Sequence, residues 1–234
     1  MNSLKYILST LLLICCETVA TSESLETRIK VAVIDTGVIK SIDKSPYMCR
    51  NGVINYTLGQ TEDNHGHGSN IVGIISKGIN PKTHCIVSIK FYKNEDSIIE
   101  NTNSYYKALE YIDSDPQIKY LNLSLGGNAY ESREKSYLFG FLKKGMTLTV
   151  ASGNDGINLD THGGYYPACY KKEYPGENFH VVRAYLGSNY GSIVTDKASG
   201  LLVDPEIPGV RALSGSSQAT AQIMAEILKR GNIK

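Results

Sequence analysis

Short apolar runs alternate with segments of helical character along most of this chain. The apolar runs lie at residues 30–34, 85–92, 120–125, 146–151 and 180–185. Residues 102–114 and 217–229 carry apolar residues at the spacing of amphipathic helices, and residues 131–144 form a third helical segment ending at Gly145. This alternation predicts an α/β protein, a three-layer α/β/α sandwich with a mostly parallel central sheet.

Such a sheet also predicts where function lies, because active sites gather at the carboxyl ends of parallel strands. Composition adds two exclusions. The 24 Lys and Arg nearly balance the 23 Asp and Glu, so a broadly basic nucleic-acid-binding surface is excluded. A hydrophobic content of 41% argues against a disordered chain. No internal repeat or linker divides the chain, so we expect one domain over residues 29–234.

The first residues have the pattern of an export signal. Lys5 precedes an apolar run at residues 6–16, and small residues follow at 18–20. The run is too short to span a bilayer, so we predict a cleaved signal peptide over residues 1–20 and no stable membrane insertion. An alternative, lipidation of a cysteine at the end of the run, lacks the small residue that should precede it. The prediction is an exported protein, periplasmic or secreted, with a short segment at residues 21–28.

Three cysteines remain after the predicted cleavage, Cys49, Cys85 and Cys169. An odd number permits at most one internal disulfide and one free thiol, and the sequence does not say which residues pair. Cys85 lies in an apolar run, which favours a buried, inert thiol at that position.

Two polar residues beside glycines are candidates for proton chemistry. Asp35 ends the first apolar run and is followed by Thr36-Gly37, a sequence that an ordinary turn also explains. His67 has glycine on both sides and opens an apolar helical segment. A surface histidine is the simpler explanation, but an imidazole at a helix start can serve as a general base. His65 and His67 are two residues apart and do not share a helix face, which opposes a helical zinc pair.

Two further residues are candidates for acyl chemistry. Residues 148–151 run as a strand into Gly153-Asn154, which is either a turn or an amide donor aimed at a developing oxyanion. Ser217 lies in a serine-rich stretch at the start of the last helix. That stretch is either a helix cap or a nucleophile surrounded by backbone N–H groups.

Taken together, these segments resemble the motifs of the subtilisin-like serine proteases, the subtilases, whose triad follows the chain order Asp, His, Ser. Asp35-Thr36-Gly37 is similar to the family's Asp motif. Gly66-His67-Gly68-Ser69 resembles its Gly-His-Gly-Thr motif, which favours His67 over His65. The resemblance therefore implies catalytic roles for Asp35 and His67.

The resemblance extends to the serine and to the substrate cleft. Residues 215–219 resemble the family's Gly-Thr-Ser-Met-Ala motif, which favours Ser217 over Ser214 and Ser216. Asn154 matches the oxyanion asparagine. By the same resemblance, two segments line the substrate, and their residues are Ser124, Leu125, Gly126, Ala151, Ser152 and Gly153.

The resemblance implies a serine endopeptidase whose subtilisin-like catalytic domain covers residues 29–234 and whose substrate is a peptide or protein. No cofactor and no dedicated metal site are expected, because residues 78–81 follow the His67 segment closely and no dense acidic cluster appears; a weak calcium site elsewhere stays open. Two alternatives remain. One is a subtilase-fold binding or regulatory protein with little turnover, and the other is an esterase or transpeptidase that uses the same triad.

Several positions depart from the family pattern. Asn70 replaces the second histidine of the His motif, Gln218 replaces methionine, and Ala221 replaces a proline. None is a triad position, so we expect local packing changes. The segment at residues 21–28 is too short for an inhibitory prosegment, so we expect a chain that folds without one or that uses a separate folding or inhibitory partner.

Overall fold

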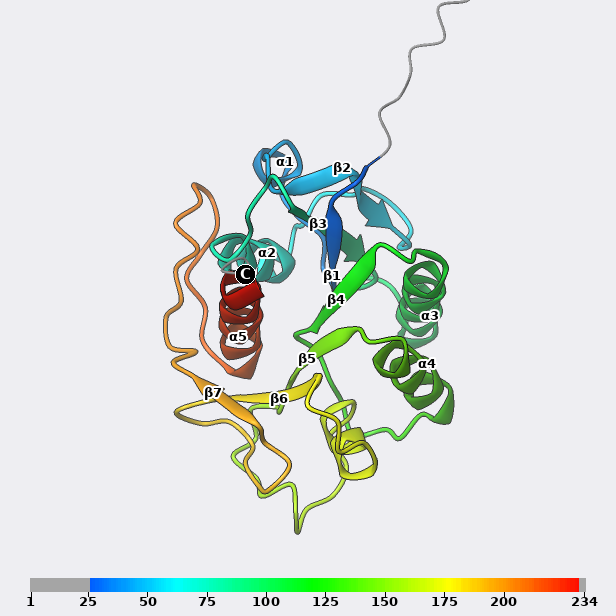
Figure 1. Ribbon diagram of the computed structural model, residues 1–234, viewed down its shortest axis with the longest axis vertical. Coiled ribbons are helices and arrows are strands. Elements are labelled where there is room, and N and C mark those ends of the chain that lie inside the picture. Colours follow the sequence, from blue (N-terminus) through cyan, green and yellow to red (C-terminus); the bar gives the residue numbers. More distant parts are fainter. Residues whose placement is uncertain (1–25, 232–234) are drawn as a thin grey trace, which may run out of the picture.

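The computed structural model of the chain describes residues 26–231. Seven parallel strands form one sheet in the order β2-β3-β1-β4-β5-β6-β7 (Figure 1). The strands are β1 (Ile29–Asp35), β2 (Met48–Asn55), β3 (His84–Lys90), β4 (Ile118–Leu123), β5 (Thr147–Ala151), β6 (Phe179–Ala184) and β7 (Asp196–Ala198). The helices are α1 (Lys40–Asp43), α2 (His67–Ser76), α3 (Ile98–Ser114), α4 (Ser132–Lys143) and α5 (Ser216–Gly231), with the 3-10 helix η1 (Ala168–Glu173).

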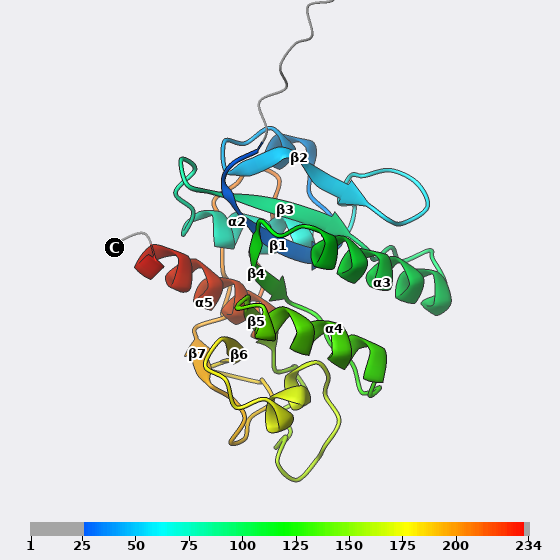
Figure 2. The same cartoon turned by 45° about the vertical axis from the view of Figure 1, so that its right-hand side comes forward.

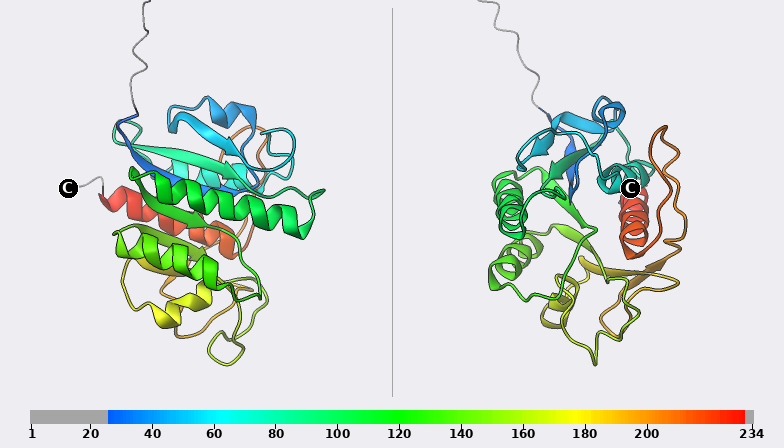
Figure 3. Two further views of the ribbon diagram at one scale, coloured as in Figure 1. Left: turned by 90° about the vertical axis from the view of Figure 1, so that its right-hand side faces the viewer. Right: turned by 180° about the vertical axis from the view of Figure 1, so that it is seen from behind.

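Helices cover both faces of the sheet. Figures 2 and 3 show α2 and α5 on one face and α3 and α4 on the other. Each face has its own apolar core, one built with residues of α3 and α4 and the other with residues of α2 and α5. The predicted three-layer α/β/α sandwich is confirmed.

The central strand β1 shows why the layers form. Val31 and Val33 point into the core beneath α2 and α5, whereas Ala32 and Ile34 point into the core beneath α3 and α4. All four side chains are fully buried. A strand covered on both faces needs apolar residues at every position, which explains the uninterrupted apolar run in the sequence.

The short elements α1, η1 and β7 were not predicted, and two longer elements also differ from the sequence-based expectation. The edge strand β2 was not predicted, because it carries exposed polar residues and its register with β3 shifts between Met48 and Val53. Helix α3 begins at Ile98, four residues before its apolar periodicity. Ser97 explains the earlier start, because it forms a capping box with Glu100: the Ser97 hydroxyl accepts from the Glu100 N–H, and the Glu100 carboxylate accepts from the Ser97 N–H.

The prediction of an inert thiol at Cys85 is wrong. Cys85 in β3 forms a disulfide with Cys49 in the neighbouring strand β2, and Cys169 is free and buried. The two Cα atoms lie 4.8 Å apart because the strands are hydrogen-bonded neighbours. The bridge ties the edge strand to the sheet across a separation of 36 residues. Loop-closure entropy gives such a link a stabilising effect of about 3–4 kcal/mol.

The predictions for the amino terminus fall mostly on residues that the structure does not describe. The signal peptide at residues 1–20 and residues 21–25 of the short segment after it lie outside the described residues. Arg28, at the end of that segment, pairs with Glu26 and donates to the carbonyl oxygens of Pro46, Met48 and Pro81. Within residues 26–231, no helix combines the length and the apolar character needed to cross a membrane.

Candidate active site

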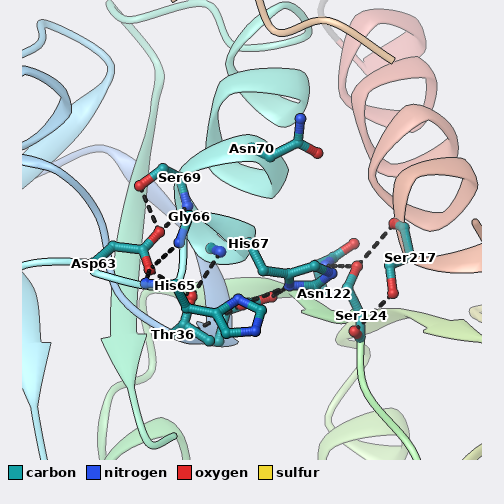
Figure 4. Close-up of polar contacts among 12 residues, drawn as sticks. Thr36, Asp63, His65, Gly66, His67, Ser69, Asn70, Asn122, Ser124 and Ser217 are labelled. Carbon is teal, nitrogen blue, oxygen red and sulfur yellow. Dashed lines mark hydrogen bonds and ion pairs between the residues drawn. The ribbon is translucent and has the colours of Figure 1, made fainter. Parts of the chain in front are cut away.

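The candidate residues gather at one edge of the sheet because the strands that lead to them are parallel neighbours. Asp35 is the last residue of β1, and Asn154 follows β5 by three residues. His67 and Ser217 lie in the first turns of α2 and α5, which pack against each other on the same face (Figure 4). Helix starts and strand ends therefore meet here, as the sequence predicts for such a sheet.

Asp35 and His67 form a direct pair. Nδ1 of His67 lies 2.8 Å from Oδ1 and 3.0 Å from Oδ2 of Asp35, whose side chain is buried. The backbone N–H of Thr36 also donates to Oδ1 of Asp35. The His65 ring makes no hydrogen bond to Asp35 in the described chain; it meets the His67 ring edge to face, with ring centroids 6.2 Å apart. Of the two histidines, His67 is the one whose tautomer Asp35 can set.

The pKa of His67 is raised above its ordinary value. Burial alone would lower this pKa, but attraction to the Asp35 carboxylate, the hydrogen bond to it and the more distant charge of Asp63 together outweigh burial. The pair thus stabilises the imidazolium while holding the Nδ1 proton on the side of Asp35. Those are the two properties that a general base in acyl transfer requires.

Asp63 holds the loop that carries His67, and the sequence analysis missed its role. Its carboxylate accepts hydrogen bonds from the Thr36 hydroxyl, the backbone N–H groups of His65 and Gly66, and both the N–H and the hydroxyl of Ser69. Gly66 is the N-cap of α2 and has no side chain to cap the helix. Asp63 supplies that cap from three residues upstream. An acidic residue three positions before a glycine N-cap is the sequence signal that could have identified this role.

Replacing Asp63 by asparagine is expected to lower the free energy of unfolding by about 3 kcal/mol. The amide has one acceptor oxygen and would turn N–H groups toward donors that the carboxylate now satisfies. Urea unfolding followed by circular dichroism measures the change. Asp113→Asn is the control, because Asp113 pairs with Lys144 on the exposed surface and should change stability by less than about 1 kcal/mol. Equal losses in the two variants would contradict the role of Asp63.

Ser217 and Ser124 hold each other. The Ser217 hydroxyl donates to the Ser124 carbonyl at 3.0 Å, and the Ser124 hydroxyl donates to the Ser217 carbonyl at 2.9 Å (Figure 4). Among residues 26–231, no hydrogen bond joins Ser217 to His67. The Ser217 hydroxyl is therefore directed at the Ser124 carbonyl and not at His67.

A buried polar chain fixes Ser124 in this position. The Thr149 hydroxyl in β5 donates to Oδ1 of Asn122 in β4, and Nδ2 of Asn122 donates to the Ser124 hydroxyl. Thr149 and Asn122 are fully buried. Because each of these polar groups has a partner, this series of hydrogen bonds holds β4 and β5 against the start of α5.

The Asn154 side chain has a fixed orientation. The backbone N–H of Ser216 donates to its Oδ1 at 2.8 Å, so the oxygen is occupied and the NH₂ group faces the other way. Nδ2 makes no hydrogen bond to any part of residues 26–231, and the side chain is exposed. Gly215 allows this approach: its φ is +140°, and a Cβ there would lie 3.1 Å from Oδ1 of Asn154. A free, oriented donor results beside Ser217.

The two predicted substrate segments leave neighbouring strands. Within the described chain, Leu125 and Gly126 make no backbone hydrogen bond, so their N–H and C=O groups are free to pair with an extended peptide. Ala151 and Ser152 are buried, and the Ser152 N–H and hydroxyl are bonded inside the protein. Gly153 is buried as well, so that segment meets the surface only from Asn154 onward.

Two departures from the family pattern contact each other. Nε2 of Gln218 donates to Oδ1 of Asn70 at 3.1 Å, and Nδ2 of Asn70 donates to the carbonyls of Val203 and Arg211. Both side chains are buried between α2 and α5. The pair satisfies its own polar groups, which fits the expectation of a local packing change.

One group of potential metal ligands occurs in the described part of the chain, formed by Glu26, Cys49 and Cys85. The two cysteines are joined in the disulfide, and Glu26 is paired with Arg28. This chemistry does not fit a metal ion. The predicted lack of a dedicated calcium site stays a prediction.

Comparisons with known proteins agree with this geometry. The profile of the subtilase family matches residues 26–228. M-protease of Shouchella clausii (strain KSM-K16) and Subtilisin Savinase of Lederbergia lenta are each 26% identical to this chain over 219 residues, or 87% of it. The aligned region spans 54% of M-protease, about half its length, and 77% of Savinase.

Two solved structures share the fold. A cold adapted subtilisin-like serine proteinase superposes with a TM-score of 0.63 at 20% identity, covering 89% of this chain and 79% of that one. A lanthipeptide protease superposes with a TM-score of 0.60 at 16% identity, covering 86% and 72%. The profile match, the parallel sheet and these likenesses lead to one conclusion: the chain belongs to the subtilase family.

Proposed function

We propose that this chain is a serine endopeptidase in which Ser217 is the nucleophile, His67 the general base and Asp35 the residue that orients the base. The observation that carries the proposal is the bonded Asp35–His67 pair at the sheet edge that also holds Ser217 and the free amide of Asn154. A carboxylate, an imidazole and a hydroxyl in these roles are the parts of a serine-hydrolase triad.

The reaction begins with a rotation of the Ser217 side chain from the Ser124 carbonyl toward Nε2 of His67. The hydroxyl oxygen attacks the substrate carbonyl carbon as His67 takes its proton, and His67 then gives that proton to the leaving amine. Asp35 keeps the Nδ1 proton in place throughout and stabilises the imidazolium. Water repeats the sequence on the acyl-enzyme and releases the second product.

The free Nδ2 of Asn154 and the backbone N–H of Ser217 are proposed to bind the oxyanion. Asn154→Ala is expected to lower kcat by about 10²–10³ with little change in KM, because the donor acts on charge that develops only in the transition state. Steady-state kinetics on a peptide amide measures it. Asn103→Ala, at an exposed position of α3, is the matched control and should leave kcat unchanged. Equal kcat values in the two variants would argue against an oxyanion role for Asn154.

The substrate is proposed to bind as an extended strand against Leu125 and Gly126, whose backbone groups are free. Main-chain hydrogen bonds do not depend on side chains, so this mode by itself selects no sequence, and it leaves specificity to the side-chain pockets. No nucleic acid is expected as a partner, given the near-neutral charge.

The test is labelling of the protein by a fluorophosphonate probe together with hydrolysis of casein and of matched peptide ester and amide substrates. We expect stoichiometric labelling, casein cleavage and turnover of both substrates. Labelling with ester turnover alone would favour the esterase or transpeptidase alternative. A folded protein that is not labelled would favour the binding-protein alternative, which the Ser217–Ser124 hydrogen bond supports because it holds the hydroxyl away from His67.

Export to the periplasm or the exterior remains part of the proposal. The Cys49–Cys85 disulfide supports it, because such bonds persist mainly in oxidising compartments. A separate folding or inhibitory partner is likewise proposed, and refolding of the purified chain from urea tests it. Recovery of labelling by the fluorophosphonate without any added protein would argue against a folding partner.

A further inference from the structure

The ring of Tyr165 lies between two glycines that come from different strands. A Cβ built on Gly126, after β4, would lie 2.4 Å from Cε1 of Tyr165. A Cβ built on Gly153, after β5, would lie 2.9 Å from Cε2 of the same ring. The opposite edges of the phenol ring therefore touch the two backbones, and the ring spans the space between the two predicted substrate segments.

This space adjoins the proposed reacting groups. Gly126 follows Ser124, whose carbonyl accepts the Ser217 hydroxyl, by two residues. Gly153 directly precedes Asn154, whose amide is held by the Ser216 N–H. A peptide that pairs with Leu125 and Gly126 and places its carbonyl at Ser217 directs the side chain of that residue into the gap between the two segments.

Backbone hydrogen bonds anchor the segment that carries Tyr165. Its neighbour Tyr166 forms an antiparallel bridge with Gly127, in which each N–H donates to the other carbonyl, at 2.9 and 2.7 Å. The carbonyl of Tyr165 itself accepts from the Cys169 N–H at 2.8 Å. The phenol hydroxyl makes no hydrogen bond within residues 26–231. The ring therefore meets both glycines through van der Waals contact and not through hydrogen bonds.

We propose that Tyr165 fills the primary specificity pocket and limits the residue that supplies the scissile carbonyl to glycine or alanine. This inference rests on the proposed peptidase function and names its substrate class. A larger side chain would have to displace a ring that is held from both sides by its backbone. The sequence-based prediction of substrate residues did not include Tyr165; the adjacent residues 166–168 resemble a family segment, but that resemblance was not used to place Tyr165 beside Gly126.

The test compares kcat/KM for peptide amides that differ only at the residue before the scissile bond, with glycine, alanine, leucine or phenylalanine there. We expect the wild-type protein to prefer alanine over phenylalanine by at least about tenfold. Tyr165→Gly should empty the pocket and raise the phenylalanine-to-alanine ratio by about 10- to 100-fold. Tyr165→Phe, which keeps the ring, should retain the wild-type ratio.

Fluorophosphonate labelling of the same samples separates the two proposals. A labelled wild-type protein that cleaves the phenylalanine peptide as well as the alanine peptide would overturn the role of Tyr165 and leave the peptidase intact. A folded wild-type protein that is neither labelled nor active would overturn the peptidase, and the specificity proposal with it. Thermal unfolding shows whether Tyr165→Gly folds; if it does not, the wild-type preference alone decides the matter.

Discussion

Replacing Ser217 by alanine is expected to abolish fluorophosphonate labelling and to lower kcat for peptide hydrolysis about a millionfold, the scale known for subtilisin-type triads. The reason is that the proposed mechanism has one nucleophile. Without the hydroxyl, His67 has no proton to take from the protein, and only the oxyanion donors and substrate binding remain. Intact mass after labelling and single-turnover hydrolysis of a peptide amide measure the two effects.

Ser216→Ala is a close control for this experiment. The Ser216 hydroxyl is buried and has no hydrogen-bond partner within the described chain, whereas its backbone N–H, which holds Asn154, is unchanged by the substitution. We therefore expect full labelling and near-normal kcat. Loss of labelling in Ser216→Ala but not in Ser217→Ala would move the nucleophile to Ser216. Retained labelling in both variants would show that the probe reacts elsewhere.

The Ser217→Ala substitution itself has a small structural consequence. Ser217→Ala removes the donor to the Ser124 carbonyl, while the reverse bond from the Ser124 hydroxyl to the Ser217 carbonyl remains. One lost hydrogen bond at a partly buried site costs about 1 kcal/mol. The folded fraction should hardly change, so a loss of labelling reports on chemistry and not on unfolding.

The sequence was most informative where burial is uniform. Strands β1, β4 and β5 lie inside the sheet, so their apolar runs predict them directly. The polar residue just past each of these runs is placed at the edge that holds the site because the strands are parallel neighbours. Strand β2 was not predicted because it lies at the edge of the sheet. An edge strand accepts exposed polar residues such as Arg50 and Asn51, and these interrupt its apolar pattern.

Contacts between distant residues could not be predicted from local pattern. Gln218 and Asn70 lie 148 positions apart and read as unrelated departures, yet they share a hydrogen bond. The partner of Cys85 lies in β2, the strand that the sequence did not reveal, and the pairing of β2 with β3 brings the two cysteines together. Tyr165 acts across a gap between two other segments, so its role depends on the assembled sheet.

Asp63 and Tyr165 suggest how a family site is adapted in one chain. The motif residues carry the proposed chemistry, and both of these residues contact backbone beside them: Asp63 accepts from the turn before His67, and the Tyr165 ring lies against Gly126 and Gly153. The glycines matter for different reasons: Gly66 has a φ of +86°, which favours glycine, whereas a Cβ on Gly126 or Gly153 would collide with the Tyr165 ring. Stability and specificity are thus set beside the motifs.

Asp35→Asn should lower kcat/KM about 10⁴-fold and move its acid limb to lower pH. An asparagine amide can donate to Nδ1 of His67, which places the proton on Nε2, where the serine proton must be received. In the wild-type protein, His67 must be neutral to act, and its raised pKa puts the acid limb above the ordinary value of 6.5. Without the carboxylate, burial remains as the cause that lowers the pKa, so the limb shifts downward.

The linked effect on stability has the opposite sense. Because the pKa of His67 is higher in the folded than in the unfolded protein, its pairing with Asp35 stabilises the fold fully below pH 6.5 and less as pH rises through the folded value.

For the pH–rate experiment, Asp196→Asn is the matched control, because Asp196 makes a similar 2.8 Å contact with Nδ1 of His180 in β6. That variant should keep the wild-type pH–rate profile. If the acid limb does not shift in Asp35→Asn, His67 is not the group that sets it. If the limb shifts in Asp196→Asn, the limb reports on His180 and not on His67.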